Sequence, residues 1–153
     1  EDFATKDTIE EIIPKKGVVI DAIDSLSNKA FIASYCRQHS LPLVICGAAA
    51  GKQDPTLIRC DDLEKSAQDN LLKRLKKKLR SDHDFPRTGD MQVSAVFSLE
   101  RAKYPTADGG LCYKKDLKDK EMAKMDCDTG MGSSSFVTGT FGFTAAYQAI
   151  KLL

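Results

Sequence analysis

The stretch from Val18 to Asp24 constrains the fold more than any other segment of the chain. Its first five residues, Val18-Val19-Ile20-Asp21-Ala22, include four apolar side chains, three of them β-branched, which is typical of a buried strand. Residues 25–39 then have the composition of an amphipathic helix, and residues 43–46 are apolar again. A strand, a helix and a second strand within about 30 residues predict a βαβ unit with parallel strands and a right-handed crossover.

Two carboxylates stand at the end of this first strand. Asp21 ends the apolar run and Asp24 follows three residues later, directly before the predicted helix. Ligand sites in open α/β sheets lie at the carboxyl ends of strands, and an acidic side chain there can hold Mg²⁺ on a nucleotide phosphate. The spacing leaves a second interpretation open, in which Asp24 only caps the helix beside Ser25.

The rest of the chain predicts the alternating helices and strands of an α/β domain. Helix 66–80 is the clearest element, because its leucines recur at helical spacing. A short helix capped by Asp7 precedes the first strand. Segments 81–92 and 103–130 are polar or rich in glycine, proline and charge, so we expect flexible loops there. The other expected ranges are helices at 8–13 and 136–153 and strands at 57–60 and 93–98.

Composition limits the class of protein without naming a partner. The chain has 153 residues, 42% of them hydrophobic and 29% charged, so we expect one domain over residues 1–153 with a sizeable core. A net charge of +1 gives no global sign of a nucleic-acid or membrane partner. The five cysteines are an odd number without close pairs, which predicts free thiols in a reducing compartment.

Several short motifs follow one another in a fixed order. The first strand leads into Asp21-Ala22-Ile23-Asp24-Ser25, and Lys29 comes five residues after Asp24. The later motifs are Gly47-Ala48-Ala49-Ala50-Gly51-Lys52, Asp54-Pro55-Thr56, Gln68-Asp69, Val96-Phe97-Ser98, Tyr104-Pro105, Asp108-Gly109-Gly110-Leu111-Cys112, Met125-Asp126-Cys127 and the run 136–143. In this order and spacing they resemble the second half of the adenylating domain of the ubiquitin-activating, E1-like superfamily. Within it, the chain resembles most the tRNA threonylcarbamoyladenosine dehydratases.

The resemblance implies a Rossmann-like, E1-type α/β fold and an ATP-dependent reaction. Such an enzyme activates the threonyl carboxylate of a modified adenosine in tRNA, and the side chain then closes into a cyclic form with loss of water. Asp24 matches the family's aspartate for magnesium and ATP, and Asp21 and Ser25 accompany it at the nucleotide. Lys29 falls where the superfamily has a basic catalytic residue, usually arginine; lysine offers a phosphate only a point charge.

The family's glycine-rich phosphate loop lies before the aspartate strand, and this chain has no such loop. Gly47 and Gly51 are four apart with alanines between them, which does not form a cradle of backbone amides for phosphate. We therefore expect the N-terminal half of the domain to be missing from this chain, which would hold about half of the ATP site. No Cys-x-x-Cys pair occurs, so no zinc is expected.

The resemblance also implies partners and a location. It implies a homodimer, a sulfur-transfer partner as one further option, and a cytoplasmic protein, with peripheral membrane or mitochondrial association as alternatives. Small residues of the terminal helix suit close helix packing at a dimer interface, and polar residues within that helix argue against a membrane span. Cys112 and Cys127 are either reactive or ordinary thiols.

The leucine-rich helix has a basic face with two interpretations. Lys73, Arg74, Lys76 and Lys77 either form an ordinary solvated face or bind the phosphates of tRNA. The sequence leaves three alternative functions open. The first is ATP-dependent dehydration of threonylcarbamoyladenosine in tRNA. The others are adenylation of a ubiquitin-like or sulfur-carrier protein, and a non-catalytic half-domain that binds RNA or dimerises.

Overall fold

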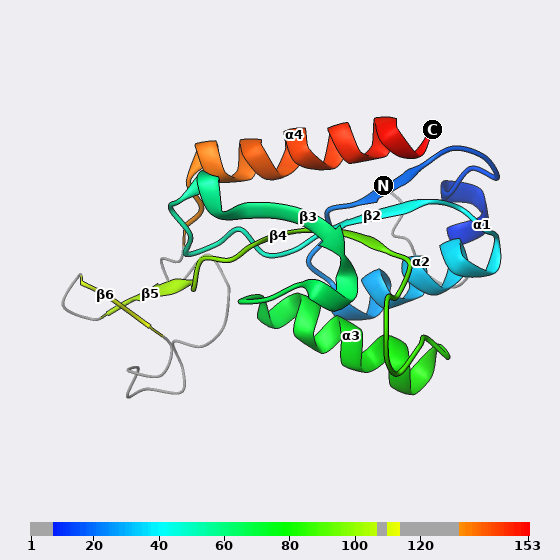
Figure 1. The fold of residues 1–153 in the computed structure, drawn as a ribbon, viewed down its shortest axis with the longest axis horizontal. Coiled ribbons are helices and arrows are strands. Elements are labelled where there is room, and N and C mark those ends of the chain that lie inside the picture. Colours follow the sequence, from blue (N-terminus) through cyan, green and yellow to red (C-terminus); the bar gives the residue numbers. More distant parts are fainter. Residues whose placement is uncertain (1–7, 107–109, 114–131) are drawn as a thin grey trace.

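The structure is a computed structural model that describes residues 8–106, 110–113 and 132–153. A four-stranded sheet with the order β1-β2-β4-β3 forms its centre. Helices α2 (Leu26–Gln38) and α3 (Asn70–Asp82) cover one face of this sheet, and α4 (Ser135–Leu152) covers the other (Figure 1). The α/β class expected from the sequence is confirmed.

The pairing of the strands confirms the βαβ unit as parallel. Strand β1 (Val19–Asp21) runs parallel to β2 (Leu43–Cys46), and β2 runs parallel to β4 (Ser94–Ser98). Strand β3 (Ile58–Asp62) pairs antiparallel with β4. One expectation is wrong in part: β1 lies at the edge of the sheet, and Ile20 is 46% exposed rather than buried.

The core has two parts because successive residues of a strand point to opposite faces of the sheet. On β2, Ile45 packs with Leu72, Leu75 and other side chains under α2 and α3. Its neighbour Val44 packs on the opposite side with residues of α4 that include Val137. Both β2 residues are fully buried, which places β2 at the centre of three layers.

The helix ends differ in detail from the sequence expectations. Helix α1 (Ile9–Ile12) has Thr8 as its N-cap residue, whereas Asp7 lies outside the described residues. Helix α3 begins at Asn70 rather than at residue 66, because Asp69 is its N-cap and Gln68 has a positive φ of 53°. The C-terminal helix is confirmed as α4. No helix in the described ranges is long and apolar enough to cross a membrane.

The loop regions contain structure that the sequence did not predict. Residues 103–130 include a hairpin of β5 (Lys103–Pro105) and β6 (Leu111–Tyr113), and residues 107–109 and 114–131 lie outside the description. In segment 81–92, Phe85 and Met91 are buried in the core. Two short 3₁₀ helices flank β3, η1 (Pro55–Leu57) before it and η2 (Leu63–Lys65) after it.

Candidate active site at the carboxyl edge of the sheet

The carboxyl ends of β1, β2 and β4 lie at one edge of the sheet, because the three strands are parallel. Asp21 at the end of β1 pairs with Ile45, one residue before the end of β2. Three segments leave this edge: residues 22–25, residues 47–52, and the turn after Ser98. Ligand sites of α/β sheets form where such segments meet.

Asp24 is exposed and has no hydrogen bond or ion pair among the described residues. The cap of α2 is Ser25 instead, whose Oγ accepts a hydrogen bond from Asn28 N at 3.4 Å. The interpretation of Asp24 as the helix cap is therefore wrong. Its carboxylate is left available for a ligand, although the described residues contain no cluster of three or more His, Cys, Asp or Glu side chains that could hold a metal by themselves.

Asp21 and Lys29 are brought together, but inside the protein. Both side chains are fully buried, and Lys29 Nζ donates to Asp21 Oδ1 at 2.9 Å and to Asp21 O at 3.3 Å. Asp21 Oδ1 also accepts from Ile23 N at 3.1 Å. The pair fixes the turn between β1 and α2, so Asp24 and Ser25 are presented to solvent on a braced segment.

Asp69 joins the loop after β2 to helix α3, a role that the sequence analysis missed. Its Oδ1 accepts from Leu72 N at 2.9 Å and its Oδ2 accepts from Ala48 N at 2.8 Å. A Cβ at position 47 would collide with Asp69 Oδ2, so only glycine fits beside this carboxylate. The signal was present, since an aspartate directly before Asn70 and a leucine-rich helix is a typical N-cap.

Lys52 is a second buried lysine and was also missed as a candidate. It is 2% exposed, its Nζ lies 3.8 Å from Asp69 Oδ2, and Nζ has no hydrogen-bond partner in the described part of the chain. Burial lowers the pKa of Lys52, and the charges of Asp69 and Glu100 oppose that shift only in part. Its partner Asp69 is distant in the sequence, so no local sequence pattern predicts that Lys52 is buried beside it.

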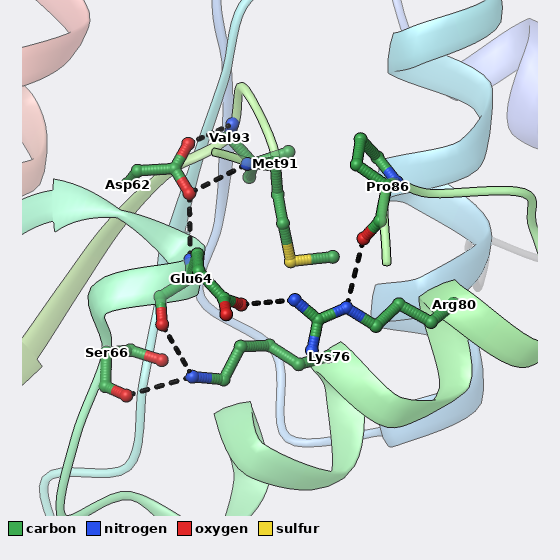
Figure 2. Close-up of polar contacts among 8 residues, drawn as sticks. All are labelled: Asp62, Glu64, Ser66, Lys76, Arg80, Pro86, Met91 and Val93. Atoms are coloured by element: carbon green, nitrogen blue, oxygen red, sulfur yellow. Dashed lines mark hydrogen bonds and ion pairs between the residues drawn. The ribbon is translucent and has the colours of Figure 1, made fainter. Parts of the chain in front are cut away.

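The basic face of α3 divides into anchored and free cations. Figure 2 shows Lys76 Nζ donating to Glu64 O at 2.9 Å and to Ser66 O at 3.0 Å, and Arg80 held by the Glu64 carboxylate and by Pro86 O. Asp62 caps η2 by accepting from Glu64 N and also receives the amides of Met91 and Val93 (Figure 2). The free cations are exposed: Lys73, Arg74, Lys77 and Arg87.

Three of these exposed cations, Lys73, Lys77 and Arg87, line a shallow cleft of about 470 Å³ on the surface of α3. Its lining includes Lys73, Lys76 and Lys77 from the predicted tRNA-binding set. The cleft also includes Arg80, which the sequence places on the same basic helix face, and Arg87, which the sequence analysis did not select. Arg87 follows the helix on segment 81–92, so its place beside Lys77 could not be derived from the periodicity of α3.

Three of the four described thiols, those of Cys36, Cys46 and Cys60, do not resemble nucleophiles. Cys36, Cys46, Cys60 and Cys112 are free, as the sequence predicted. Burial, assisted by Asp21, raises the pKa of Cys36 to about 11, and burial also raises the pKa of Cys46 and of Cys60. These three thiols are protonated near neutral pH and so are weak nucleophiles. Cys127 lies outside the described residues.

Known proteins are similar to this chain in sequence and in fold. The chain is 40% identical over 154 residues to the tRNA threonylcarbamoyladenosine dehydratase of Escherichia coli K12, a match that spans 99% of the chain and 57% of the relative. A protein of the same name from Haemophilus influenzae is 35% identical over 137 residues, 88% of the chain and 49% of the relative. The chain is a homologue of the tRNA threonylcarbamoyladenosine dehydratases. No family model matches it.

Solved dehydratase structures agree with the fold. The structure named TcdA (CsdL) superimposes with a TM-score of 0.83 at 38% identity and covers 98% of this chain and 55% of its own. A crystal structure of the E. coli dehydratase TcdA in complex with ATP gives a TM-score of 0.75 at 35% identity, covering 98% of this chain and 53% of its own. The chain thus spans about half the length of the dehydratases it matches.

Proposed function

We propose that this chain forms part of an enzyme that uses ATP to dehydrate N6-threonylcarbamoyladenosine in tRNA to its cyclic form. The observation that carries the proposal is the exposed, unpaired Asp24 carboxylate at the carboxyl edge of a sheet whose fold matches an ATP-bound dehydratase. A carboxylate reacts poorly until one of its oxygens becomes part of a good leaving group. Attack of that oxygen on the α-phosphorus of ATP would provide this, because it attaches AMP to the carboxylate and releases pyrophosphate.

Asp24 and Ser25 are proposed to face the nucleotide. Carboxylate and hydroxyl oxygens are hard ligands of the kind that Mg²⁺ prefers, and Mg²⁺ commonly needs only one or two carboxylates when phosphates and waters supply the rest. A bound Mg²⁺ would offset the phosphate charge that develops during activation. One free carboxylate in a braced turn fits that requirement.

We assign Lys29 and Asp21 a positioning role rather than direct contact with phosphate. Their mutual hydrogen bonds occupy the Lys29 ammonium, and neither side chain reaches the surface. Bonds from Lys29 Nζ and Ile23 N to the Asp21 carboxylate hold the turn that carries Asp24. Loss of Lys29 would then reduce turnover by misplacing Asp24, with a loss of stability as well.

The remaining phosphate contacts are proposed to come from a segment equivalent to the part of the longer relatives that these 153 residues do not match. Strand β1 is an edge strand with an exposed Ile20 and, among the described residues, a buried Asp21 Oδ2 without a hydrogen-bond partner. Edge strands present unpaired backbone groups that readily accept another strand. A further strand on β1 would bring its own loop to the carboxyl edge beside Asp24 if it were parallel.

Homodimerisation is retained as a proposal, with a different surface from the one expected. Ala145 and Ala149 of the expected small-residue face pack inward against the sheet. Outward, α4 exposes Phe143 at 79%, Tyr147 at 65% and Ile150 at 69%, an apolar strip suited to a second copy of the chain. Sedimentation equilibrium of Phe143→Ser/Ile150→Ser against the parent would show whether dimerisation depends on this strip.

tRNA is the proposed macromolecular substrate, and the cleft on α3 is the proposed contact for its phosphates. Lys73, Lys77 and Arg87 are exposed cations that line this cleft with the anchored Lys76 and Arg80. Arg74 is exposed on the same helix but does not line the cleft. No feature of the described residues supports a sulfur-transfer partner. A tRNA substrate is consistent with a cytoplasmic location.

The decisive test is mass spectrometry of nucleosides after incubation of the native protein with Mg²⁺, ATP and tRNA that carries threonylcarbamoyladenosine. Loss of one water from that nucleoside, dependent on ATP, is expected. Asp24→Asn should abolish it, while Asp54→Asn, a change at a partly exposed aspartate that caps η1, should retain it. Unchanged conversion by Asp24→Asn would contradict the assignment of Asp24, and tRNA binding without any conversion would favour a non-catalytic half-domain.

A further inference from the structure

A second cleft lies at the end of the molecule where α4 begins and the β5–β6 hairpin projects (Figure 1). Its volume is about 280 Å³, and its lining includes Lys52, Lys103, Ser133 and Ser134. None of these residues has a role in the function proposed above. The cleft is also separate from the one on α3, with which it shares no lining residue.

Backbone hydrogen bonds join the three segments that form this cleft. Gly51 N donates to Gly132 O at 3.0 Å, and Lys103 N donates to Gly51 O at 2.9 Å. Gly51 has a φ of +72°, a conformation that glycine adopts without strain, so the chain can turn between its two neighbours. The walls are therefore fixed by the fold and do not depend on one loop.

The cleft has unused hydrogen-bond donors. Lys52 Nζ is buried without a hydrogen-bond partner, and the Lys103 side chain forms no ion pair with any described residue. Ser134, the N-cap residue of the 18-residue helix α4, makes no side-chain capping bond. The amino end of a helix of this length carries partial positive charge and free amides.

The nearby carboxylates, by contrast, are already occupied. Asp69 accepts from the amides of Ala48 and Leu72. Glu100 Oε2 accepts from Gln53 N and Asp54 N, both at 2.8 Å. Both carboxylates act on the charge of Lys52. The Asp69 Oδ2 atom pairs with the Lys52 ammonium only at 3.8 Å, which is beyond normal hydrogen-bond distance. A buried donor without an acceptor is costly, so an added acceptor at this place would be stabilised.

We propose that this cleft is a binding site for a small oxyanion, either a carboxylate or a phosphate group. Lys52 supplies a desolvated charge, Lys103 a second charge at the rim, and the first turn of α4 supplies backbone amides. Charge-assisted bonds of this kind are the stronger ones in proteins, and helix amino ends are common sites for anions. The site stands on the cleft alone and does not require the dehydratase activity.

The test is a titration of the ¹⁵N-labelled native protein, followed by amide NMR, with inorganic phosphate and separately with acetate at constant ionic strength. Residue-resolved signals are needed because phosphate will also contact the cations of α3. Saturable shifts are expected at Gly51, Ser135 and Phe136. The tighter of the two anions identifies the source, nucleotide phosphate or substrate carboxylate.

Variants separate a built site from an adventitious effect. Lys52→Met should weaken binding at these amides by about tenfold or more, since a hydrogen bond to a charged group is lost. Lys65→Gln removes an equal charge from an exposed pair with Asp61 and should change nothing. Lys103→Gln, at the rim, should weaken binding severalfold without affecting folding.

Two results would overturn the proposal. One is a set of linear, non-saturating shifts for both anions, and the other is unaltered affinity in both Lys52→Met and Lys103→Gln. The titration contains neither tRNA nor ATP. Its failure would therefore leave the proposed dehydratase function untouched, and failure of the dehydratase assay would leave the oxyanion site untouched.

Discussion

Lys29 and Lys52 are two buried lysines near the same edge of the sheet, and only one of them completes its bonds. Lys29 Nζ makes two hydrogen bonds to Asp21, the shorter at 2.9 Å. Lys52 Nζ lies 3.8 Å from Asp69 and 6.0 Å from the centre of the Phe141 ring, without a hydrogen bond to any described residue. Burial therefore does not separate structural from ligand-binding lysines, whereas completed hydrogen bonds do.

The largest effect is expected from Lys29→Met. The change leaves the Asp21 carboxylate buried without its cation, which typically costs about 3–5 kcal/mol of the free energy of unfolding. Urea denaturation of the native protein measures it. The double variant Lys29→Met/Asp21→Leu removes both charges and should recover much of the loss; a double variant as unstable as the single one would show that the ion pair is not the cause.

Gly47→Ala should have the next largest effect, because it acts on Asp69, the carboxylate that pairs with Lys52 among the described residues. The new methyl group would collide with Asp69 Oδ2 and break its bond with Ala48 N. We expect a loss of about 1–3 kcal/mol, the usual cost of a disrupted buried hydrogen bond. Gly139→Ala is the matched control, since its methyl meets open space within α4 and should stabilise the helix by about 0.5–1 kcal/mol.

Features that depend on residues close together in the sequence could be predicted from it, whereas contacts between distant residues could not. Strand β1, the parallel βαβ unit and the position of Asp24 at the end of that strand follow from local apolar runs and from the rule for strand ends. The start of α3 was misplaced because Lys65 and Ser66 suit a helix locally, while the cap at Asp69 decides the boundary.

Long-range contacts account for what could not be predicted. The β5–β6 hairpin contains Pro105 and depends on pairing with Leu111–Tyr113, so no strand pattern is visible in either segment alone. Lys52 and Asp69 meet only through the loop after β2, and Lys29 turns inward only because β1 places Asp21 beside it. The sequence therefore predicted Asp21, Asp24, Ser25 and Lys29 as site residues. It did not predict which hydrogen bonds Lys29 and Lys52 form.

Lys52→Met should change the pH dependence of stability more than stability itself. Burial holds the folded pKa of Lys52 below 10.5, its ordinary value, so between the two values the unfolded chain binds more protons. The free energy of unfolding contributed by this group therefore rises as pH increases through that window, by about 1.4 kcal/mol per pKa unit of difference.

The measurement is urea denaturation of parent and variant at about pH 7 and about pH 10. Lys52→Met should be as stable as the parent, or more stable, at the lower pH, and this advantage should shrink at the higher pH. The groups facing Lys52 are the carboxylates of Asp69 and Glu100 and the ring of Phe141. An advantage that stays constant with pH would show that the ammonium is not destabilised by burial.

The smallest effects are expected from substitutions on α3. Its surface lysines also divide into those with hydrogen bonds to the protein and those without. Lys77 is exposed, while Lys76 holds the carbonyls of Glu64 and Ser66. Lys73→Gln/Lys77→Gln should weaken tRNA binding severalfold and lower the slope of log affinity against log salt by up to about 2, without loss of stability. Filter binding over a range of salt concentrations measures both quantities.

Lys76→Gln is the control, because it removes the same charge from the same helix. It should lower the stability of the protein by about 1 kcal/mol through the lost bonds to backbone carbonyls, with a smaller change in the salt slope than the Lys73/Lys77 pair. The contrary result is that Lys76→Gln reduces the salt slope as strongly as Lys73→Gln/Lys77→Gln and leaves stability constant. That result would show that Lys76 contacts tRNA and that its bonds to Glu64 and Ser66 do not stabilise the protein. The distinction between anchored and free cations would then fail at this surface.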